Sequence, residues 1–145
     1  GVEGIIPVEM NRCVVKLDDK KKKSKIARWQ SISESAAKQS RRTIIPEVSS
    51  VMSFKEAINR AKEFELGIIP YENFKDMKET REVLKKVQKG IKIGIFIGPE
   101  GGFEESEVQY ALENGIHPIS LGKRILRTET AGLAILSVLM FELED

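Results

Sequence analysis

One run of apolar residues places the strongest limit on what this chain can fold into. Residues 91–97 read Ile-Lys-Ile-Gly-Ile-Phe-Ile, which has the length of a strand and little of the polar alternation expected when one face meets water. Such a run predicts a strand covered on both faces, and we expect it to be central in its sheet. The segment Gly98-Pro99-Glu100-Gly101-Gly102 follows. Its glycines indicate either a tight turn or a close backbone approach to a ligand.

Shorter apolar runs and amphipathic segments alternate along the rest of the chain. Strands are expected at residues 4–8, 13–17, 43–48, 66–72 and 118–121. Helices are expected at residues 25–39, 54–61, 77–87, 104–114 and 128–141, the second of them opening on a capping box at Ser53 and Glu56. This alternation predicts a parallel α/β sheet with helices on both faces. The 145 residues suffice for one domain, 1–145, and are too few for two.

The last helical segment is apolar on nearly every side. Residues 131–141 carry almost no polar side chain, so a helix there has no face suited to water. Such a helix needs the sheet on one side and a further cover on the other, and we expect a second copy of the chain, in a homodimer. The run is only about three turns long, too short to cross a membrane.

Cysteine content and the chain start narrow the setting in which the protein works. Cys13 is the only cysteine, so an internal disulfide is excluded and a reducing cytoplasm is expected. The Cys13 side chain itself is expected to be a small, buried apolar group. No cluster of His, Cys and carboxylate side chains suggests a metal site. No signal peptide opens the chain, and its start at Gly1 without a methionine indicates a fragment.

Charge is distributed unevenly. Residues 1–42 carry 11 Lys and Arg against 5 Asp and Glu, whereas residues 43–145 carry 13 against 17. Residues 20–23 alone fit a solvated loop, but together with the other cations they indicate a nucleic-acid surface, because phosphate contacts supply most of the non-specific affinity. The candidate RNA-binding residues are Arg12, Lys22, Arg28, Arg41 and Arg42.

A second polar segment, Leu-Gly-Lys-Arg-Ile-Leu-Arg-Thr-Glu-Thr-Ala at residues 121–131, lies between a strand and the apolar helix. Thr128 suits an N-cap and Glu129 a first helical turn, so both have structural interpretations. Arg124 and Arg127 fit less easily, because a positive charge near a helix N-terminus opposes the helix dipole. These arginines are therefore functional candidates, whereas His117, at a strand start before Pro118, is interpreted as structural.

The two loop motifs together resemble one known family. Residues 98–102 match neither the dinucleotide fingerprint nor the P-loop, and Glu100 suits a cationic ligand better than a polyphosphate. "IGPEGGF" with "LGKRILRTETA", and upstream "RWQSISESAAKQSRR" with "IIPEV", closely resemble the RsmE ribosomal RNA methyltransferases of the SPOUT superfamily. These enzymes methylate N3 of a uridine in 16S rRNA during ribosome biogenesis. The resemblance implies a C-terminal trefoil knot that binds S-adenosylmethionine, a rare exception to unknotted topology.

The resemblance also implies a site, carried over position by position. The cofactor would be enclosed by the loop after Ile69, the glycine loop and the segment after Leu121. Arg127 and Arg124 would hold the target base or its phosphate, and Glu129 is a candidate general base, although a purely capping role fits it equally. Arg12 would reach the same cleft or contact phosphate at the surface. The implied cofactor-binding residues are Ile97, Gly98, Pro99, Glu100, Gly101, Gly102, Leu121, Gly122, Ile125, Leu126, Arg127 and Thr130.

Three positions depart from the family pattern, and one region of the family's chain has no counterpart here. Ser35 stands where Glu is usual, Arg41 where Gly is common and Glu104 where Ser is usual. Family members usually begin with a β-barrel RNA-binding domain, then the first strand and helix of the methyltransferase domain, and this chain starts at what resembles the end of that helix. Two other functions stay open: an RNA-binding or assembly module without catalysis, and a SPOUT methyltransferase that acts on tRNA.

Overall fold

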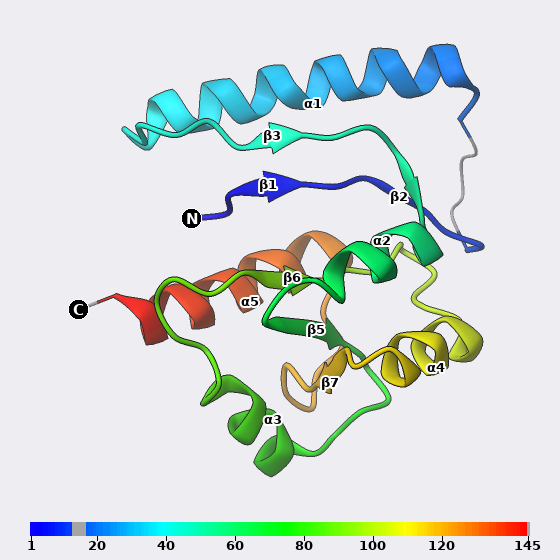
Figure 1. The fold of residues 1–145 in the computed structure, drawn as a ribbon, viewed down its shortest axis with the longest axis vertical. Helices are drawn as coiled ribbons and strands as arrows, with labels where there is room; N and C mark the ends of the chain where they lie inside the picture. The colour runs from blue at the N-terminus through cyan, green and yellow to red at the C-terminus, as the bar shows by residue number, and fades with distance from the viewer. Residues whose placement is uncertain (13–16, 145) are drawn as a thin grey trace.

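Strands and helices are arranged in layers (Figure 1). A computed structural model of the chain describes residues 1–12 and 17–144. The strand expected at residues 13–17 and the side chain of Cys13 lie outside or at the edge of the described residues. The strands form one sheet of three and two parallel pairs, and all the strand pairs are parallel.

The three-stranded sheet has the order β6-β5-β7, with β5 (Leu66–Pro70), β6 (Ile93–Ile95) and β7 (His117–Ile119). In its register, Ile68 pairs with Ile95 on one side and His117 on the other. β5 is therefore the central strand, and its first four residues are buried. The expectation that residues 91–97 form the central strand is wrong for the described chain, because β6 lies at the sheet edge and is only half-buried.

Helices cover both faces of this sheet. Ile69 packs with Phe54, Ile58 and Val108 on the face of α2 (Phe54–Ala61) and α4 (Glu105–Glu113). The neighbouring Ile68 packs on the opposite face, with Val83, Ile119, Ile135 and Leu139 against α3 (Met77–Leu84) and α5 (Thr128–Leu143). Successive strand residues point to opposite faces, so this split follows from the apolar run in β5. The prediction of a parallel α/β fold with helices on both faces is confirmed.

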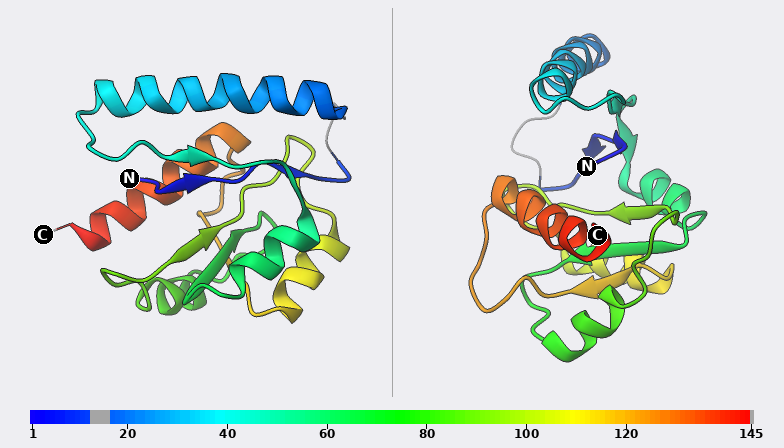
Figure 2. Two further views of the ribbon diagram at one scale, coloured as in Figure 1. Left: turned by 45° about the horizontal axis from the view of Figure 1, so that its top comes forward. Right: turned by 90° about the vertical axis from the view of Figure 1, so that its left-hand side faces the viewer.

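The N-terminal region forms a layer of its own above this sheet. β1 (Gly4–Ile5) pairs with β3 (Glu47–Val48), and β2 (Val8–Glu9) pairs with β4 (Met52–Ser53). Figure 2 shows β1 and β3 between helix α1 (Asp19–Gln39) and the rest of the molecule. Two polar side chains of α1 hold β3. Ser33 Oγ donates to the Pro46 carbonyl at 2.7 Å, and Gln30 Oε1 accepts from the Val48 amide at 2.8 Å.

Helix boundaries differ from the expectation mainly in α1 and α3. The Asp18 side chain caps α1 by accepting from the Lys21 amide at 2.8 Å, so the helix begins six residues before the expected position 25 and includes the lysine run. Helix α3 ends at Leu84, three residues before the expected end, and Gly90 has a positive φ of 89° beyond it. The capping box at Ser53 and Glu56 is present at the start of α2.

Helix α5 is buried on only one side. Ile135 and Leu139 pack on the sheet, whereas Leu133, Val138 and Phe141 are 69%, 38% and 84% exposed. The helix is thus not covered all round within the described residues. None of the helices in residues 1–12 and 17–144 combines the length and apolar character needed to cross a membrane.

Candidate functional site

Three loops meet at the carboxyl ends of the three parallel strands. They surround a cavity of about 110 Å³. Parallel strands end at one edge of a sheet, and open α/β sheets bind ligands just outside that edge. The loop after β5 contributes Pro70, Tyr71 and Glu72. The remaining lining comes from the glycine loop and from the segment that leads into α5: Ile97, Gly98, Pro99, Gly102, Phe103, Ser120, Leu121, Gly122, Arg124, Ile125, Leu126, Thr128 and Ala131.

The cavity brings together most of the predicted cofactor residues. Those lining it are Ile97, Gly98, Pro99, Gly102, Leu121, Gly122, Ile125 and Leu126. Glu100, Gly101, Arg127 and Thr130 do not line it. Tyr71, Phe103, Ser120 and Thr128 were missing from the predicted set. Tyr71 lies in the loop after Ile69, and Phe103 and Thr128 lie within the two motifs, so the sequence locates their loops, but their types and spacing do not identify them as lining residues.

Two glycines of the glycine loop, residues 98–102, are required by packing within the protein, and a third by the turn. A Cβ on Gly98 would lie 3.0 Å from Phe103 Cε2, and one on Gly101 would lie 3.2 Å from Arg12 Cβ. Gly102 has a φ of 77°, and its amide donates to the Pro99 carbonyl at 2.8 Å, which closes a tight turn. The segment is thus a tight turn, as one interpretation of the sequence predicts, and it also forms one wall of the cavity.

Residues 11 and 12 hold the glycine loop in place. Arg12 Nη1 donates to the Gly101 carbonyl at 3.1 Å and to the Phe103 carbonyl at 3.2 Å. Asn11 Nδ2 donates to Glu104 Oε2 at 3.1 Å. Glu104 is the N-cap residue of α4, and its amide donates to Glu107 Oε1 at 2.7 Å. Arg12, predicted to contact RNA, thus connects the end of the β2 segment to the cavity wall.

The loop between β7 and α5 is held in place by a buried hydroxyl group of α3. Thr80 Oγ1 donates to the Asp76 carbonyl at 2.7 Å and accepts from the Ser120 amide at 2.9 Å. Ser120 Oγ in turn accepts from the Gly122 amide at 3.2 Å. Thr80 and Ser120 are both buried, so these bonds fix where the loop leaves β7. Sequence reasoning placed Thr80 only in an apolar stripe, because its partner is 40 residues away.

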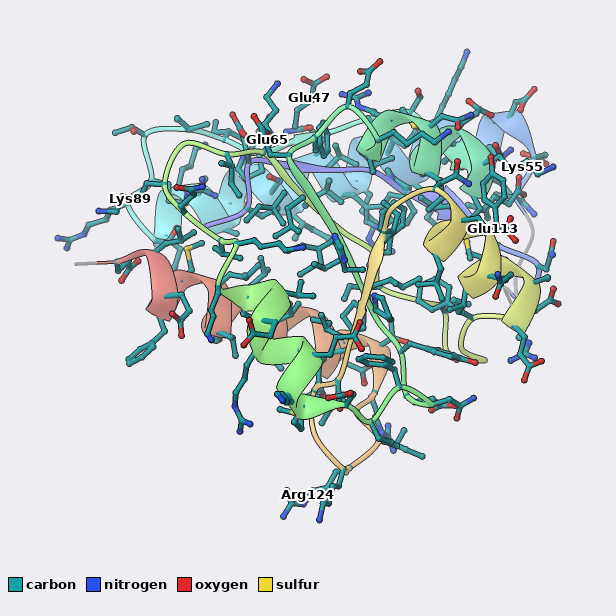
Figure 3. All side chains as sticks on the ribbon, turned by 60° about the horizontal axis from the view of Figure 1, so that its bottom comes forward. Glu47, Lys55, Glu65, Lys89, Glu113 and Arg124 are labelled. Atoms are coloured by element: carbon teal, nitrogen blue, oxygen red, sulfur yellow. The ribbon has the colours of Figure 1, made fainter. Side chains whose placement is uncertain are left out.

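The predicted catalytic residues lie around the start of α5. Arg127, rather than Thr128, is the N-cap, and its carbonyl accepts from the Thr130 amide at 3.0 Å and the Ala131 amide at 2.8 Å. Glu129 lies in the first turn of α5 and is exposed. A negative charge at this position interacts favourably with the helix dipole. Arg124 lines the cavity, and Figure 3 shows it at the outer tip of the loop between β7 and α5.

The predicted RNA-binding residues fall into two groups. Arg12, Lys22 and Arg42 have partners within the chain. Lys22 Nζ lies 3.4 Å from Glu9 Oε2, and Arg42 Nη1 donates to the Val2 carbonyl at 2.7 Å. Arg28 on α1 and Arg41 just beyond its end are exposed. Arg41 has a φ of 58°, a conformation that favours glycine. This geometry explains why a glycine suits this position, where the sequence departs from the family pattern.

Titratable groups add little to the site. His117 starts β7, outside the cavity lining, and its pKa is lowered by partial burial and by the nearby positive charge of Lys86. Within residues 1–12 and 17–144, no group of three or more His, Cys, Asp and Glu side chains could hold a metal ion.

Comparison with known proteins gives a consistent result. The family model for the RNA methyltransferase domain matches residues 1–140. Ribosomal RNA small subunit methyltransferase E of Bacillus subtilis is 40% identical over 147 residues, which is 99% of this chain and 57% of that protein. The namesake from Mesomycoplasma hyopneumoniae is 36% identical and is also covered to 57%. The chain thus spans little more than half the length of these relatives.

Two solved structures share the fold and were determined with the methyl donor bound. A Legionella pneumophila protein in complex with the cofactor SAM superposes with a TM-score of 0.89 at 34% identity, over 100% of this chain and 57% of that one. Ribosomal RNA small subunit methyltransferase E of Neisseria gonorrhoeae, bound to S-adenosyl methionine, gives 0.81 at 35% identity, over 99% and 56%.

Proposed function

Because this chain belongs to the RsmE family of RNA methyltransferases, we propose that it carries the methyl-transfer site of a longer enzyme. The enzyme uses S-adenosylmethionine to methylate N3 of a uridine in the 16S rRNA of the small ribosomal subunit. The observation that carries the proposal is the convergence of three strand-end loops on one cavity, with both recognisable motifs in its wall.

The lining of the cavity suits the chemistry of this cofactor. Its aliphatic walls, among them Ile97, Leu121 and Leu126, fit a flat apolar ring, while Glu72 offers a negative charge toward a cationic ligand. Gly122 has a φ of 109° and open space where a Cβ would lie, so ligand atoms can approach the backbone there. Sites that enclose a ligand of this size usually exceed about 300 Å³. We therefore expect the loop at residues 121–128 to move outward when the cofactor binds.

The chain's own residues are assigned the remaining chemical tasks. S-adenosylmethionine, when bound, supplies an electrophilic methyl carbon attached to a sulfonium. The protein must align N3 of the uracil, accept its proton and stabilise the negative charge left on the base. Arg124 and Arg127 hold the base or its phosphate, because a guanidinium stays charged and offers forked donors. Glu129 accepts the N3 proton, while the new bond from N3 to the methyl carbon replaces the carbon–sulfur bond.

Cofactor binding is tested by calorimetry on the full-length protein. Gly122→Ala should weaken binding of S-adenosylmethionine at least about tenfold, since the new Cβ enters the cavity. Gly90→Ala is a matched control: Gly90 also has a positive φ and open space, but it lies outside the cavity. Both variants bear a similar backbone strain, so only the first should lose affinity. An absence of heat with the wild-type protein would remove the proposal.

Catalysis is tested on small ribosomal particles that lack the modification. Arg127→Ala should lower the methylation rate by about 10²-fold or more, the usual cost of lost electrostatic stabilisation, while particles still bind. Lys123→Ala removes an exposed neighbouring cation of the same loop to which no role is assigned, and it is the control. A wild-type rate in Arg127→Ala would refute that residue's role. Methylation mapped to tRNA, or RNA binding without methylation, would favour the two other functions that the sequence leaves open.

The remaining features of the proposal rest on the resemblance of residues 98–102 and 121–131 to the family. They are a trefoil knot in the C-terminal region, a homodimer and action in the cytoplasm. The homodimer has a further support in the exposed apolar side chains of α5.

A further inference from the structure

A second group of cations lies in the part of the chain whose net charge is negative. Residues 75–92 carry seven Lys and Arg against three Asp and Glu, although residues 43–145 as a whole carry 13 against 17. Four of these cations lie in α3 or at its ends: Lys75, Lys78, Arg81 and Lys85. We call them the α3 cations. All four are exposed in the described chain, so they are open to a partner.

The helical period places three of the α3 cations on one side of the helix. α3 packs toward the sheet through Thr80 and Val83, which are both buried. Lys78, Arg81 and Lys85 follow the spacing i, i+3 and i+7, so they share the side of α3 that points away from the sheet. From the first to the last of them the helix rises about 10 Å. The three side chains therefore form a row on the outside of the molecule.

The needs of the helix explain only part of this positive charge. Cations in the last turn of a helix interact favourably with the helix dipole, which accounts for Arg81 and Lys85. Lys78 lies in the first turn and Lys75 just before the N-cap, where a positive charge opposes the dipole. Within residues 1–12 and 17–144, Lys85 pairs with Glu82 at 2.8 Å, and the other three α3 cations form no ion pair. Exposed charge that neither the dipole nor an ion pair stabilises favours an anionic partner.

The amino end of α3 lies next to the proposed methyl-transfer cavity. Thr80 Oγ1 accepts from the amide of Ser120, and Ser120 lines that cavity. Figures 1 and 3 show α3 beside the loop between β7 and α5, and Figure 3 places Arg124 at the tip of this loop. Arg124 lines the same cavity. The α3 cations therefore extend the positive charge of Arg124 outward from the cavity over the surface of the molecule.

We propose that the α3 cations bind phosphates of the RNA strand that flanks the target base. This inference rests on the proposed function, because a base held by Arg124 belongs to a strand whose neighbouring phosphates pass over the surface beside the cavity. An RNA backbone is a row of negative charges, which matches a row of exposed cations. Phosphate contacts fix the position of a nucleic acid without reading its sequence. The α3 cations are therefore positioning residues.

This surface is separate from the RNA-binding residues that the sequence indicates. Those residues lie within positions 1–42, and Figure 1 shows α1 and α3 at opposite ends of the molecule. The RNA therefore contacts the protein in two regions. The region at α3 lies beside the proposed cavity, so its contacts determine where the target base enters.

The affinity of the full-length protein for small ribosomal particles, measured over a range of salt concentrations, tests the proposal. Lys75→Gln combined with Lys78→Gln should weaken binding about tenfold or more and flatten the salt slope by roughly 1.4–1.8, since each phosphate contact contributes roughly 0.7–0.9. The matched control is Lys55→Gln combined with Lys62→Gln. It removes the same charge from exposed positions at α2, on the opposite face of the sheet, and should leave the slope unchanged. Equal slopes for the two double variants overturn the proposal.

Two further measurements separate this result from loss of folding and from failure of the proposed function. Lys75 and Lys78 lie outside the described cavity lining, so calorimetry should give the wild-type affinity for S-adenosylmethionine. The variant should also be at least as stable as wild type in urea titrations, because both lysines oppose the helix dipole. Binding of particles requires no methyl transfer. A wild-type protein that binds particles without methylating them therefore removes the proposed function and leaves the assignment of α3 intact.

A photo-crosslinking residue in place of Glu82 identifies the partner. The Glu82 side chain is 59% exposed and lies among the α3 cations, so the position tolerates a larger side chain. We expect crosslinks to small-subunit RNA within a few nucleotides of the methylated uridine. The same residue in place of Asn59, exposed on α2, is the control and should give no RNA crosslink. Crosslinks from position 82 to a ribosomal protein alone, or equal RNA crosslinks from both positions, overturn the proposal.

Discussion

Arg12 connects the two regions of the molecule that form the wall of the candidate site. Its Nη1 donates to the carbonyls of Gly101 and Phe103; the first bond is exposed and the second half-buried, so solvent screening reduces their contribution to stability below the about 1.5–3 kcal/mol of a shielded charged hydrogen bond. Arg12→Lys keeps the charge, but its ammonium ends one bond short of the position of Nη1, which donates both hydrogen bonds. We expect about tenfold weaker binding of S-adenosylmethionine by calorimetry, with the salt dependence of RNA binding unchanged. Arg81→Lys, on exposed α3, is the control. If Arg12→Lys binds the cofactor normally, Arg12 does not position the glycine loop, and the interpretation of Arg12 as a phosphate-binding residue is favoured instead.

Arg41 combines backbone strain with a charge on the predicted RNA surface. A residue other than glycine in the left-handed region costs roughly 1–2 kcal/mol, partly offset by glycine's greater freedom in the unfolded chain. Arg41→Gly should therefore raise the free energy of unfolding by about 0.5–1 kcal/mol in urea titrations. It should also weaken RNA binding and flatten the salt slope by roughly 0.7–0.9. Arg41→Ala should weaken RNA binding without the gain in stability. If Arg41→Gly and Arg41→Ala have the same free energy of unfolding, the backbone at position 41 is not strained.

At the level of elements, α3 fixes the loop after β7 through one hydroxyl. Thr80→Val keeps the side-chain shape but leaves the buried Ser120 amide without its acceptor. We expect the free energy of unfolding to fall by about 1–3 kcal/mol, the cost of an unpaired buried group, and cofactor affinity to fall with it. Thr80→Ser retains the oxygen and should retain both properties. If Thr80→Val binds the cofactor as tightly as Thr80→Ser, α3 does not position the loop.

The elements that sequence predicts best are those with their own local signals. The capping box at Ser53 and the apolar run of β5 can each be recognised within a few consecutive residues. The start of α1 is missed because residues 20–25 carry no apolar stripe, although Asp18 offers a cap and lysine is a good helix former. The position of β6 is mispredicted for a different reason: an apolar run does not say how many strands lie beside it, and among the described strands β6 pairs with β5 alone, at the sheet edge.

The candidate site is likewise predictable only where its residues form a local sequence pattern. Glycine turns and a polar segment between strand and helix can be read from sequence, and most of their residues line one cavity. The contacts that hold these loops cannot be read, since Arg12 and Gly101 lie 89 residues apart and Thr80 and Ser120 lie 40 apart. Such pairs carry no short-range periodicity. They exist only once the sheet has brought the loop ends together.

At the scale of the whole molecule, α5 presents apolar side chains that residues 1–12 and 17–144 leave exposed. Leu133 and Phe141 are the most exposed of them. We expect the full-length protein to sediment as a dimer at micromolar concentration, and Leu133→Lys combined with Phe141→Lys to shift it to the monomer by removing apolar area from the interface. Glu142→Lys, on the same helix, controls for the added charge. A wild-type protein that sediments as a monomer would contradict the proposal.

The separation of β1 from the three-stranded sheet has a consequence for the order of folding. β1 pairs with β3 and β6 pairs with β5, and no strand pairing joins β1 to β6 within residues 1–12 and 17–144. Residues of β1 and β6, about 90 positions apart in the sequence, line one cavity between them, and contacts over such a separation require the closure of long loops and form slowly. The layer of β1, β3 and α1 and the sheet around β5 are therefore expected to assemble first as separate cooperative units. Their docking would be the late, rate-limiting step, during which the open edges of β1 and β6 are exposed to aggregation.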